Sequence, residues 1–154
     1  MKGKRMTTKE IKAGLCKYGK KIAACGLVAG AGGNISARDG EIIWMKPSGV
    51  TLDDMEPIDL CGMRISDGKQ LKGKRKPTTE VNMHLAIYRM RPDCQAVFHT
   101  HSPWAGGVLS SGVDFEPMFP EFVVDLGRRA TVPYITATTQ KLADAVAKAS
   151  KNAE

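Results

Sequence analysis

Residues 34–45 have the sequence Asn-Ile-Ser-Ala-Arg-Asp-Gly-Glu-Ile-Ile-Trp-Met, which predicts a β-hairpin. Its two halves, 34–38 and 41–45, carry the β-branched and apolar side chains that are typical of strands. Asp39-Gly40 between them is a favoured two-residue turn, because glycine accepts the positive φ that tight hairpins require. The hairpin therefore predicts antiparallel strand pairing in this part of the chain.

Further short strands are predicted along the rest of the chain. Residues 60–66 and 69–71 flank a second turn, Asp67-Gly68, and residues 95–100 form an apolar run. Residues 132–135 are a candidate edge strand. The middle of the chain is therefore predicted to be a meander of antiparallel strands.

Four helices are predicted from their capping residues. Thr7 and Glu10 have the spacing of a capping box, and Ser102 precedes a proline, which is favoured at the first helical position. The expected helices occupy residues 8–25, a segment with Thr79 as its cap that ends before Arg91-Pro92, residues 103–110, and a segment from Thr139 to about Ser150. Residues 115–122, rich in Phe and Pro, are predicted to be a loop. Helices around antiparallel strands predict a layered α/β fold, with helices on both faces of a mainly antiparallel sheet.

The composition predicts one folded domain over residues 1–154. Hydrophobic residues make up 42% of the chain and charged residues 25%, which excludes a disordered chain. No apolar run approaches the roughly 20 residues that a membrane helix needs, and no apolar segment follows the basic start as in a signal peptide. The four cysteines lack Cys-x-x-Cys spacing, so reduced thiols in an apolar interior are expected. We therefore predict a cytoplasmic protein without membrane association.

The formal net charge of +7 is compatible with several partners. Basic residues cluster within residues 72–76, which is compatible with nucleic-acid binding. However, no aromatic residue is interleaved with this cluster to stack on bases. An anionic small substrate, or ordinary solvated lysines, would explain the charge equally well.

His99 and His101 are a candidate metal-binding pair at the end of the last predicted strand. Side chains at positions i and i+2 of a strand point to the same face, so both imidazoles can approach one ion. Neutral imidazole nitrogens are preferred ligands of zinc-type ions. Taken alone, the pair is equally compatible with ordinary surface or core histidines.

Three loops offer hydrogen-bond donors to an anion. Residues 30–34 are rich in glycine, whose bare backbone N–H groups allow close approach, and they end in Asn34. This loop lies between a helix and a strand, the reverse of the order in dinucleotide-binding folds. The other two loops contain Ser48-Gly49 and Thr78-Thr79. Each also fits an ordinary role in a turn or helix cap, but three together favour a phosphate pocket.

Glu80 and His84 follow the third loop, on one helix. A carboxylate in the first helical turn is stabilised by the helix dipole, so Glu80 is either a structural residue or a candidate for proton transfer. His84 is predicted to pack or to form hydrogen bonds within the fold.

The order and spacing of these motifs resemble the class II aldolase/adducin family. The motifs are Gly32-Gly33-Asn34-Ile35-Ser36, Lys46-Pro47-Ser48-Gly49, Pro77-Thr78-Thr79-Glu80, His84-Leu85-Ala86-Ile87-Tyr88 with Arg91-Pro92-Asp93, and Ala96-Val97-Phe98-His99-Thr100-His101. The resemblance extends from about Glu10 to the end of the chain. The family includes aldolases, pentulose-phosphate epimerases, a methylthioribulose-phosphate dehydratase and non-enzymatic adducin heads.

The resemblance implies roles for individual residues. It implies that His99 and His101 are zinc ligands, and that Glu80 both coordinates the resting metal and moves protons. It also implies a set of phosphate-binding residues: Gly33, Asn34, Ser48, Gly49, Thr78 and Thr79. Adducin heads are expected to lack the metal histidines, so the presence of both favours an enzyme.

The implied activity is that of a zinc-dependent aldolase. It reversibly cleaves a phosphorylated ketose, similar to L-fuculose 1-phosphate, into dihydroxyacetone phosphate and an aldehyde. The alternatives are an epimerase or dehydratase on the same scaffold, and a non-catalytic adducin-type binding module. The family also implies a homo-oligomer, a tetramer with active sites between subunits, and nucleic acid is not expected as a partner.

One departure from the family concerns the third zinc ligand. In the family this histidine lies in a His-Gly motif on a strand after the last predicted helix, and the present sequence stops at Glu154. We therefore expect either a form truncated at its C-terminus or a short variant with an incomplete metal site. A missing strand is also expected to leave a sheet edge uncovered.

Overall fold

The computed structural model describes residues 5–113, 116 and 118–153, which form two compact units. The sheet unit comprises residues up to Thr79 together with Gln95–His101. The helical unit comprises Glu80–Cys94 together with the described residues from Ser102 onward. The single domain expected over residues 1–154 stays a prediction.

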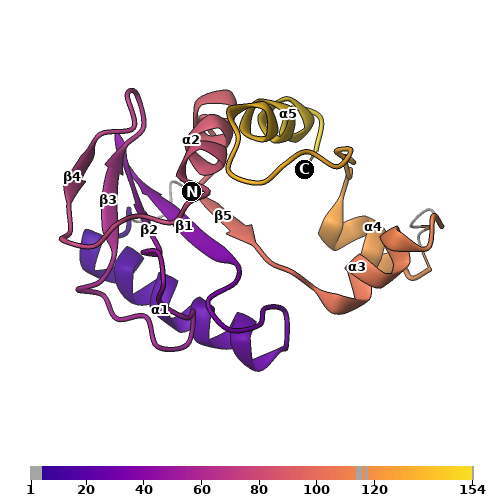
Figure 1. The fold of residues 1–154 in the computed structure, drawn as a ribbon, viewed down its shortest axis with the longest axis horizontal. Coiled ribbons are helices and arrows are strands. Elements are labelled where there is room, and N and C mark those ends of the chain that lie inside the picture. The colour runs from indigo at the N-terminus through magenta and orange to yellow at the C-terminus, as the bar shows by residue number, and fades with distance from the viewer. Residues whose placement is uncertain (1–4, 114–115, 117, 154) are drawn as a thin grey trace. The chain divides into compact units, whose positions relative to one another are not determined.

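The sheet unit is built on a five-stranded antiparallel sheet (Figure 1). Its strands are β1 (Asn34–Asp39), β2 (Ile42–Met45), β3 (Cys61–Arg64), β4 (Gln70–Lys72) and β5 (Ala96–His99). Their order in the sheet is β4-β3-β2-β1-β5, so the first four strands form the expected meander and β5 returns to pair with β1. The prediction of an α/β fold with a mainly antiparallel sheet is confirmed.

The first hairpin differs from its prediction by one residue. Asp39 pairs with Ile42, so the two-residue turn is Gly40-Glu41 and not Asp39-Gly40. Gly40 has a φ of 63°, as the first position of such a turn requires. The Asp39 carboxylate accepts hydrogen bonds from Thr8 Oγ1 at 2.6 Å and Trp44 Nε1 at 3.1 Å, and these bonds hold Asp39 within β1.

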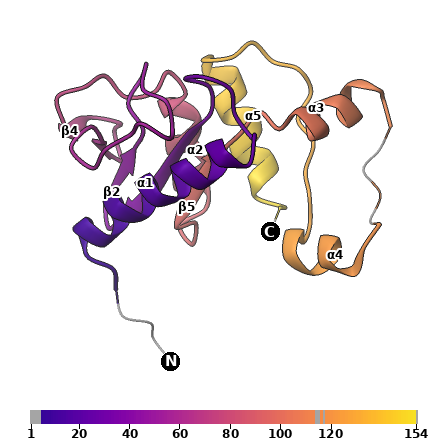
Figure 2. The same ribbon diagram turned by 90° about the horizontal axis from the view of Figure 1, so that it is seen from below.

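Helix α1 (Thr8–Ala24) packs on β1 and β2, across one face of the sheet (Figure 2). The predicted capping box is present, with Thr7 N donating to Glu10 Oε2 at 2.7 Å and Glu10 N donating to Thr7 Oγ1 at 3.3 Å. The core between α1 and the sheet contains the following residues: Ile11, Leu15, Cys16, Ile35, Trp44, Leu52, Met55 and Leu60. Each of these larger apolar side chains contributes about 1.5–3 kcal/mol on burial, so this core anchors β1 and β2.

The helical unit contains α2 (Val81–Met90), α3 (Pro103–Ser110), α4 (Pro120–Leu126) and α5 (Gln140–Ser150). Helices α2 and α5 pack side by side, as both ribbon views show (Figures 1 and 2). Glu80 precedes α2 and accepts a hydrogen bond from Thr138 N, just before α5. Arg91 follows α2 and donates to the carbonyls of Ser150, the last residue of α5, and of Ala153 beyond it. The two helices therefore run parallel. The negative charge of Glu80 at the start of α5 and the positive charge of Arg91 at its end both complement the dipole of that helix.

Replacing Arg91 by methionine is expected to destabilise the fold by about 1.5–3 kcal/mol, the usual contribution of hydrogen bonds to a charged group. The Arg91 guanidinium bonds the Ser150 carbonyl at 2.7 Å and the Ala153 carbonyl at 2.8 Å. Urea unfolding would measure the loss. Lys141→Met, at an exposed position of α5, is the control and should change stability by less than about 0.5 kcal/mol. Equal unfolding midpoints for the two variants would contradict a stabilising role for the two Arg91 hydrogen bonds.

The structure corrects several local predictions. The N-cap of α2 is Glu80 and not Thr79, and it makes no side-chain capping bond. Residues 132–135 form no strand. Pro133 has no backbone N–H, so it cannot donate a hydrogen bond to a neighbouring strand. Helix α4 begins at Pro120, within the loop predicted for residues 115–122, because proline is well suited to the first helical position. Residues 115 and 117 of that loop lie outside the described residues.

The cysteines match their prediction only in part. All four are free thiols, and Cys16 and Cys61 are buried. Cys25 is exposed, because it follows the last turn of α1 as its C-cap residue. Across the residues that the structure describes, no helix is both long enough and apolar enough to cross a membrane.

Candidate functional site

The antiparallel pairing of β1 with β2 and β5 gathers most of the candidate residues at one edge of the sheet. Because β1 runs opposite to both neighbours, its first residue, Asn34, lies beside the last residue of β5, His99. Near this edge, the loop after β2 contains Ser48 and Gly49, and Thr78 N donates to Lys46 O at 3.1 Å. The sheet unit thus brings the histidines and the three donor loops together.

His99 and His101 lie close together, as their spacing predicted. Their ring centroids are 4.9 Å apart and the planes are inclined by 63°. His99 ends β5 and is half-buried, and exposed His101 is anchored by its own N–H, which donates to Leu27 O at 2.9 Å. Two imidazoles at this separation can direct nitrogen lone pairs toward one ion.

Asn34 connects the histidine pair to the glycine-rich loop, residues 30–34. Its side-chain nitrogen lies 3.3 Å from His99 Nδ1, and the residue is buried. An amide can donate to Nδ1 or, turned over, accept from a protonated Nδ1 through its oxygen. In the second arrangement His99 Nε2 carries the lone pair that a metal ligand needs, so Asn34 can orient His99 in the way that residues bonded to metal ligands commonly do.

Two glycines allow the loop to approach the histidine strand. A Cβ on Gly33 would overlap Val28 Cγ1 and lie 2.8 Å from His99 O, and the φ of Gly33 is 65°. A Cβ on Gly32 would lie 2.9 Å from Ala29 O and 3.4 Å from His101 Nδ1. The loop therefore needs glycine both for its backbone angle and for its contact with the histidines.

Lys46 is a candidate that the sequence prediction missed. It directly follows β2 and is buried, and its Nζ donates to Ala31 O of the glycine-rich loop at 2.9 Å. Burial lowers the pKa of its amine, because the charged form loses hydration. The signal in the sequence is a lysine between an apolar strand and a Pro-Ser-Gly turn. Lys46 places a cation directly beside the proposed phosphate loop.

The second and third donor loops are bonded to each other. Ser48 N donates to Lys76 O at 2.9 Å, and Pro47 and Pro77 form an isolated bridge. Within these loops, Ser48, Gly49 and Thr79 are exposed. The hydroxyls of Ser48 and Thr79 and the backbone of Gly49 are therefore accessible to a ligand.

Glu80 belongs to the helical unit and directly follows Thr79 in the chain. Its side chain is buried, and Oε1 accepts a hydrogen bond from Thr138 N at 3.1 Å. His84, one turn farther along α2, is fully buried, as expected for a residue that packs within the fold. Glu80 is therefore a carboxylate held by a backbone donor at the start of a helix.

The histidine pair is the candidate for binding a metal ion. Among residues 5–113, 116 and 118–153, no three histidine, cysteine, aspartate or glutamate residues cluster in a way that would hold an ion. The spacing and nitrogen chemistry of His99 and His101 nevertheless fit two ligands of a divalent cation.

A family model described as the class II aldolase and adducin N-terminal domain matches residues 13–154. The chain belongs to this family. Class II aldolases generally use a divalent metal ion, which accords with the histidine pair.

Relatives of this chain include two proteins named as sugar-phosphate aldolases. The 5-deoxy-D-ribulose 1-phosphate aldolase of Bacillus thuringiensis is 39% identical over 83% of this chain and 61% of its own length. The L-fuculose phosphate aldolase of Methanocaldococcus jannaschii is 38% identical over 79% of this chain and 65% of its own. The present chain thus spans less than two thirds of the length of these relatives.

A solved structure confirms the fold. YgbL of Klebsiella pneumoniae, described as a candidate aldolase, epimerase or decarboxylase, superposes with a TM-score of 0.88 at 26% identity. The superposition covers 97% of this chain and 74% of that protein.

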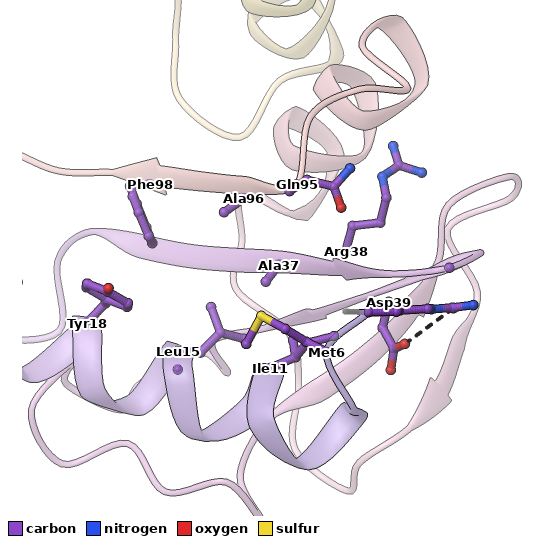
Figure 3. A pocket seen from close by; sticks show the side chains of 13 residues that line it. Met6, Ile11, Leu15, Tyr18, Ala37, Arg38, Asp39, Gln95, Ala96 and Phe98 are labelled. Carbon is purple, nitrogen blue, oxygen red and sulfur yellow. Dashed lines mark ion pairs between the residues drawn. The ribbon is translucent and has the colours of Figure 1, made fainter. Parts of the chain in front are cut away.

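A pocket lies on the α1 face of the sheet unit (Figure 3). Its volume is about 430 Å³, and its apolar wall includes Leu15, Tyr18, Ala96 and Phe98. Side chains alternate along a strand, so Ala96 and Phe98 line this pocket while His99 points to the opposite face. The pocket is therefore separate from the histidine pair.

Proposed function

We propose that this chain contributes the substrate-binding and metal-binding part of a ketose 1-phosphate aldolase. The observation that carries the proposal is the link between the histidine pair and the glycine-rich loop, made by Asn34 at 3.3 Å from His99. The names of the two aldolase relatives support a ketose 1-phosphate as substrate. The products would be dihydroxyacetone phosphate and an aldehyde.

In this proposal the donor loops hold the phosphate. The residues involved are Gly33, Asn34, Ser48, Gly49, Thr78 and Thr79. Lys46 adds a positive charge beside the glycine-rich loop, where its Nζ lies 2.9 Å from Ala31 O. Binding energy from the phosphate positions the substrate without touching the reacting carbons, so it can be used for catalysis.

His99, His101 and Glu80 are proposed to hold the divalent cation, with zinc as the preferred ion because the two nitrogen donors suit it. A bound zinc ion would supply Lewis acidity toward the substrate carbonyl. Asn34 would fix the ring orientation of His99 through Nδ1.

Glu80 is proposed to carry a proton during cleavage. In a ketose 1-phosphate the bond between C3 and C4 breaks, the C4 hydroxyl loses its proton to form the aldehyde, and C3 gains a proton. A carboxylate can exchange a proton at C3, and Glu80 is held by its bond from Thr138 N.

A panel of ketose 1-phosphates tests the proposal. Release of dihydroxyacetone phosphate and an aldehyde, in equal amounts, is the expected result. Epimerised, dehydrated or decarboxylated products would favour another enzyme on this scaffold. This is the second candidate function, and the description of YgbL as an aldolase, epimerase or decarboxylase supports it. No turnover of any kind, together with no metal bound at neutral pH, would favour an adducin-type binding module.

Zinc is expected to stabilise the protein through the histidine pair. At a zinc concentration 100 times its Kd, the gain is about 2.7 kcal/mol and should appear as a higher Tm. His101→Ala should remove most of this gain, because it deletes one of two nitrogen ligands. Calcium is the control ion, since it prefers oxygen ligands and should not raise Tm. An equal rise for His101→Ala would rule out the pair as the binding site.

The protein is further proposed to be a cytoplasmic homotetramer. Apolar side chains of the helical unit support self-association: Trp104 and Leu109 on α3 are 86% and 56% exposed, and α3 has no buried residue. Sedimentation equilibrium is expected to show an oligomer that Leu109→Glu weakens, because a charge would enter the apolar surface. A monomeric wild-type protein would contradict this.

A further inference from the structure

The turn before α5 contains a strained residue next to Glu80. Thr138 has a φ of 65°, and among the described residues it is the one non-glycine residue with a positive φ. A β-branched residue rarely adopts this conformation, because its Cβ crowds the backbone. Strain of this kind persists only where the surrounding structure imposes it, and it often marks a functional position.

The neighbouring residues impose this conformation on Thr138. Thr139 Oγ1 donates to Thr136 O at 2.7 Å and accepts from Leu142 N at 3.2 Å as the N-cap of α5. These bonds fix the chain on both sides of Thr138. The bend between Thr136 and Thr139 is therefore taken up at Thr138.

The strained conformation gives one backbone N–H a defined direction. Thr138 N donates to Glu80 Oε1 at 3.1 Å, across 58 residues of sequence. A glutamate side chain has several rotatable bonds, and a single firm hydrogen bond removes much of that freedom. Glu80 makes no side-chain capping bond to its own helix, and its Oε1 is held by the Thr138 N–H.

We propose that Thr138 is a positioning residue for the reaction. Its N–H holds the Glu80 carboxylate in the orientation from which a proton is transferred, and the positive φ at Thr138 is what aims this donor. The inference rests on the proton-transfer role proposed for Glu80, and it assigns Thr138 no contact with substrate or metal.

Three single variants separate positioning from a purely structural role. Thr138→Gly keeps the N–H and tolerates the positive φ, so kcat should stay within about twofold of wild type. Thr138→Pro removes the N–H and requires a negative φ, so kcat should fall about tenfold to a hundredfold with KM nearly unchanged. Gln140→Ala removes the bond from Gln140 Nε2 to Asp144 Oδ1 within α5 and leaves both bonds of the Thr139 hydroxyl in place, so it is the matched control, with a slightly lower Tm but kcat within about twofold of wild type.

The same variants can overturn the proposal. Wild-type kcat in Thr138→Pro would do so, as would a loss of kcat in Gln140→Ala as large as that in Thr138→Pro. If Thr138→Pro does not fold, Glu80→Asp replaces it, because a side chain shorter by one methylene withdraws the carboxylate from the Thr138 N–H. Full activity of Glu80→Asp would then overturn the proposal.

A double-variant cycle provides a readout that does not depend on turnover. The Tm losses of Glu80→Ala and Thr138→Pro should add to more than the loss of the double variant, because both remove the same hydrogen bond. Additive losses in an active enzyme would overturn the positioning role alone. Coupled losses in a protein that cleaves no ketose phosphate would overturn the proposed function, and the positioning role with it.

Discussion

Glu80→Gln is expected to lower turnover by about a hundredfold to ten-thousandfold, the usual contribution of a positioned acid or base. Glutamine cannot take up and release a proton at neutral pH. The fold should remain intact, because the glutamine amide oxygen can accept the Thr138 N–H that Glu80 Oε1 now accepts. Initial rates of aldehyde release, together with thermal unfolding, would measure both effects.

Glu41→Gln is the matched control for this change. Glu41 is an exposed residue of the first hairpin turn, and its neutralisation should leave both rate and Tm unchanged. A Glu80→Gln enzyme that turns over at the wild-type rate would exclude the proton-transfer role of Glu80. A large loss of Tm would instead show that its charge is needed for folding.

Gly33→Ala is expected to destabilise the protein by about 2–5 kcal/mol, from backbone strain and overpacking together. Gly33 has a φ of 65°, and an added Cβ would overlap Val28 Cγ1 and lie 2.8 Å from His99 O. Typical domains are stable by only about 5–15 kcal/mol, so this one methyl group would remove a large share of the total. Urea unfolding would measure the loss.

Gly14→Ala is the opposite case within the same protein. Gly14 lies inside α1, where an added Cβ has no neighbour within 4 Å. Alanine is the better helix former, so this variant should gain about 0.5–1 kcal/mol. If both glycine variants gained stability, the close approach of the loop to His99 would be disproved.

Local signals in the sequence were sufficient to predict much of the fold. The capping box at Thr7 and Glu10, and the caps at Ser102 and Thr139, each depend on residues within three positions of one another. The hairpin at residues 34–45 was predicted for the same reason, apart from a one-residue shift of its turn. That shift depends on Thr8 Oγ1, which bonds Asp39 from a distant helix.

Features that depend on tertiary contacts escaped prediction. Glu80 replaces Thr79 as the N-cap of α2, and its carboxylate is bonded to Thr138 instead of its own helix. The contact between Lys46 and Ala31 O likewise joins residues from separate loops. The motif containing each residue was identified, but the partner of each side chain is set by the packed structure.

The pairing of β1 with β5 has a consequence for the order of folding. Asn34 pairs with His99 across 65 residues, whereas Asp39 pairs with Ile42 across a two-residue turn. Each doubling of a closed loop adds about 0.6 kcal/mol of entropic cost, so the β1–β5 ladder is expected to form late and to slow refolding. The imidazoles of His99 and His101 would then reach the glycine-rich loop only after the β1–β5 ladder has formed. An ion that binds them would select chains that have completed the sheet.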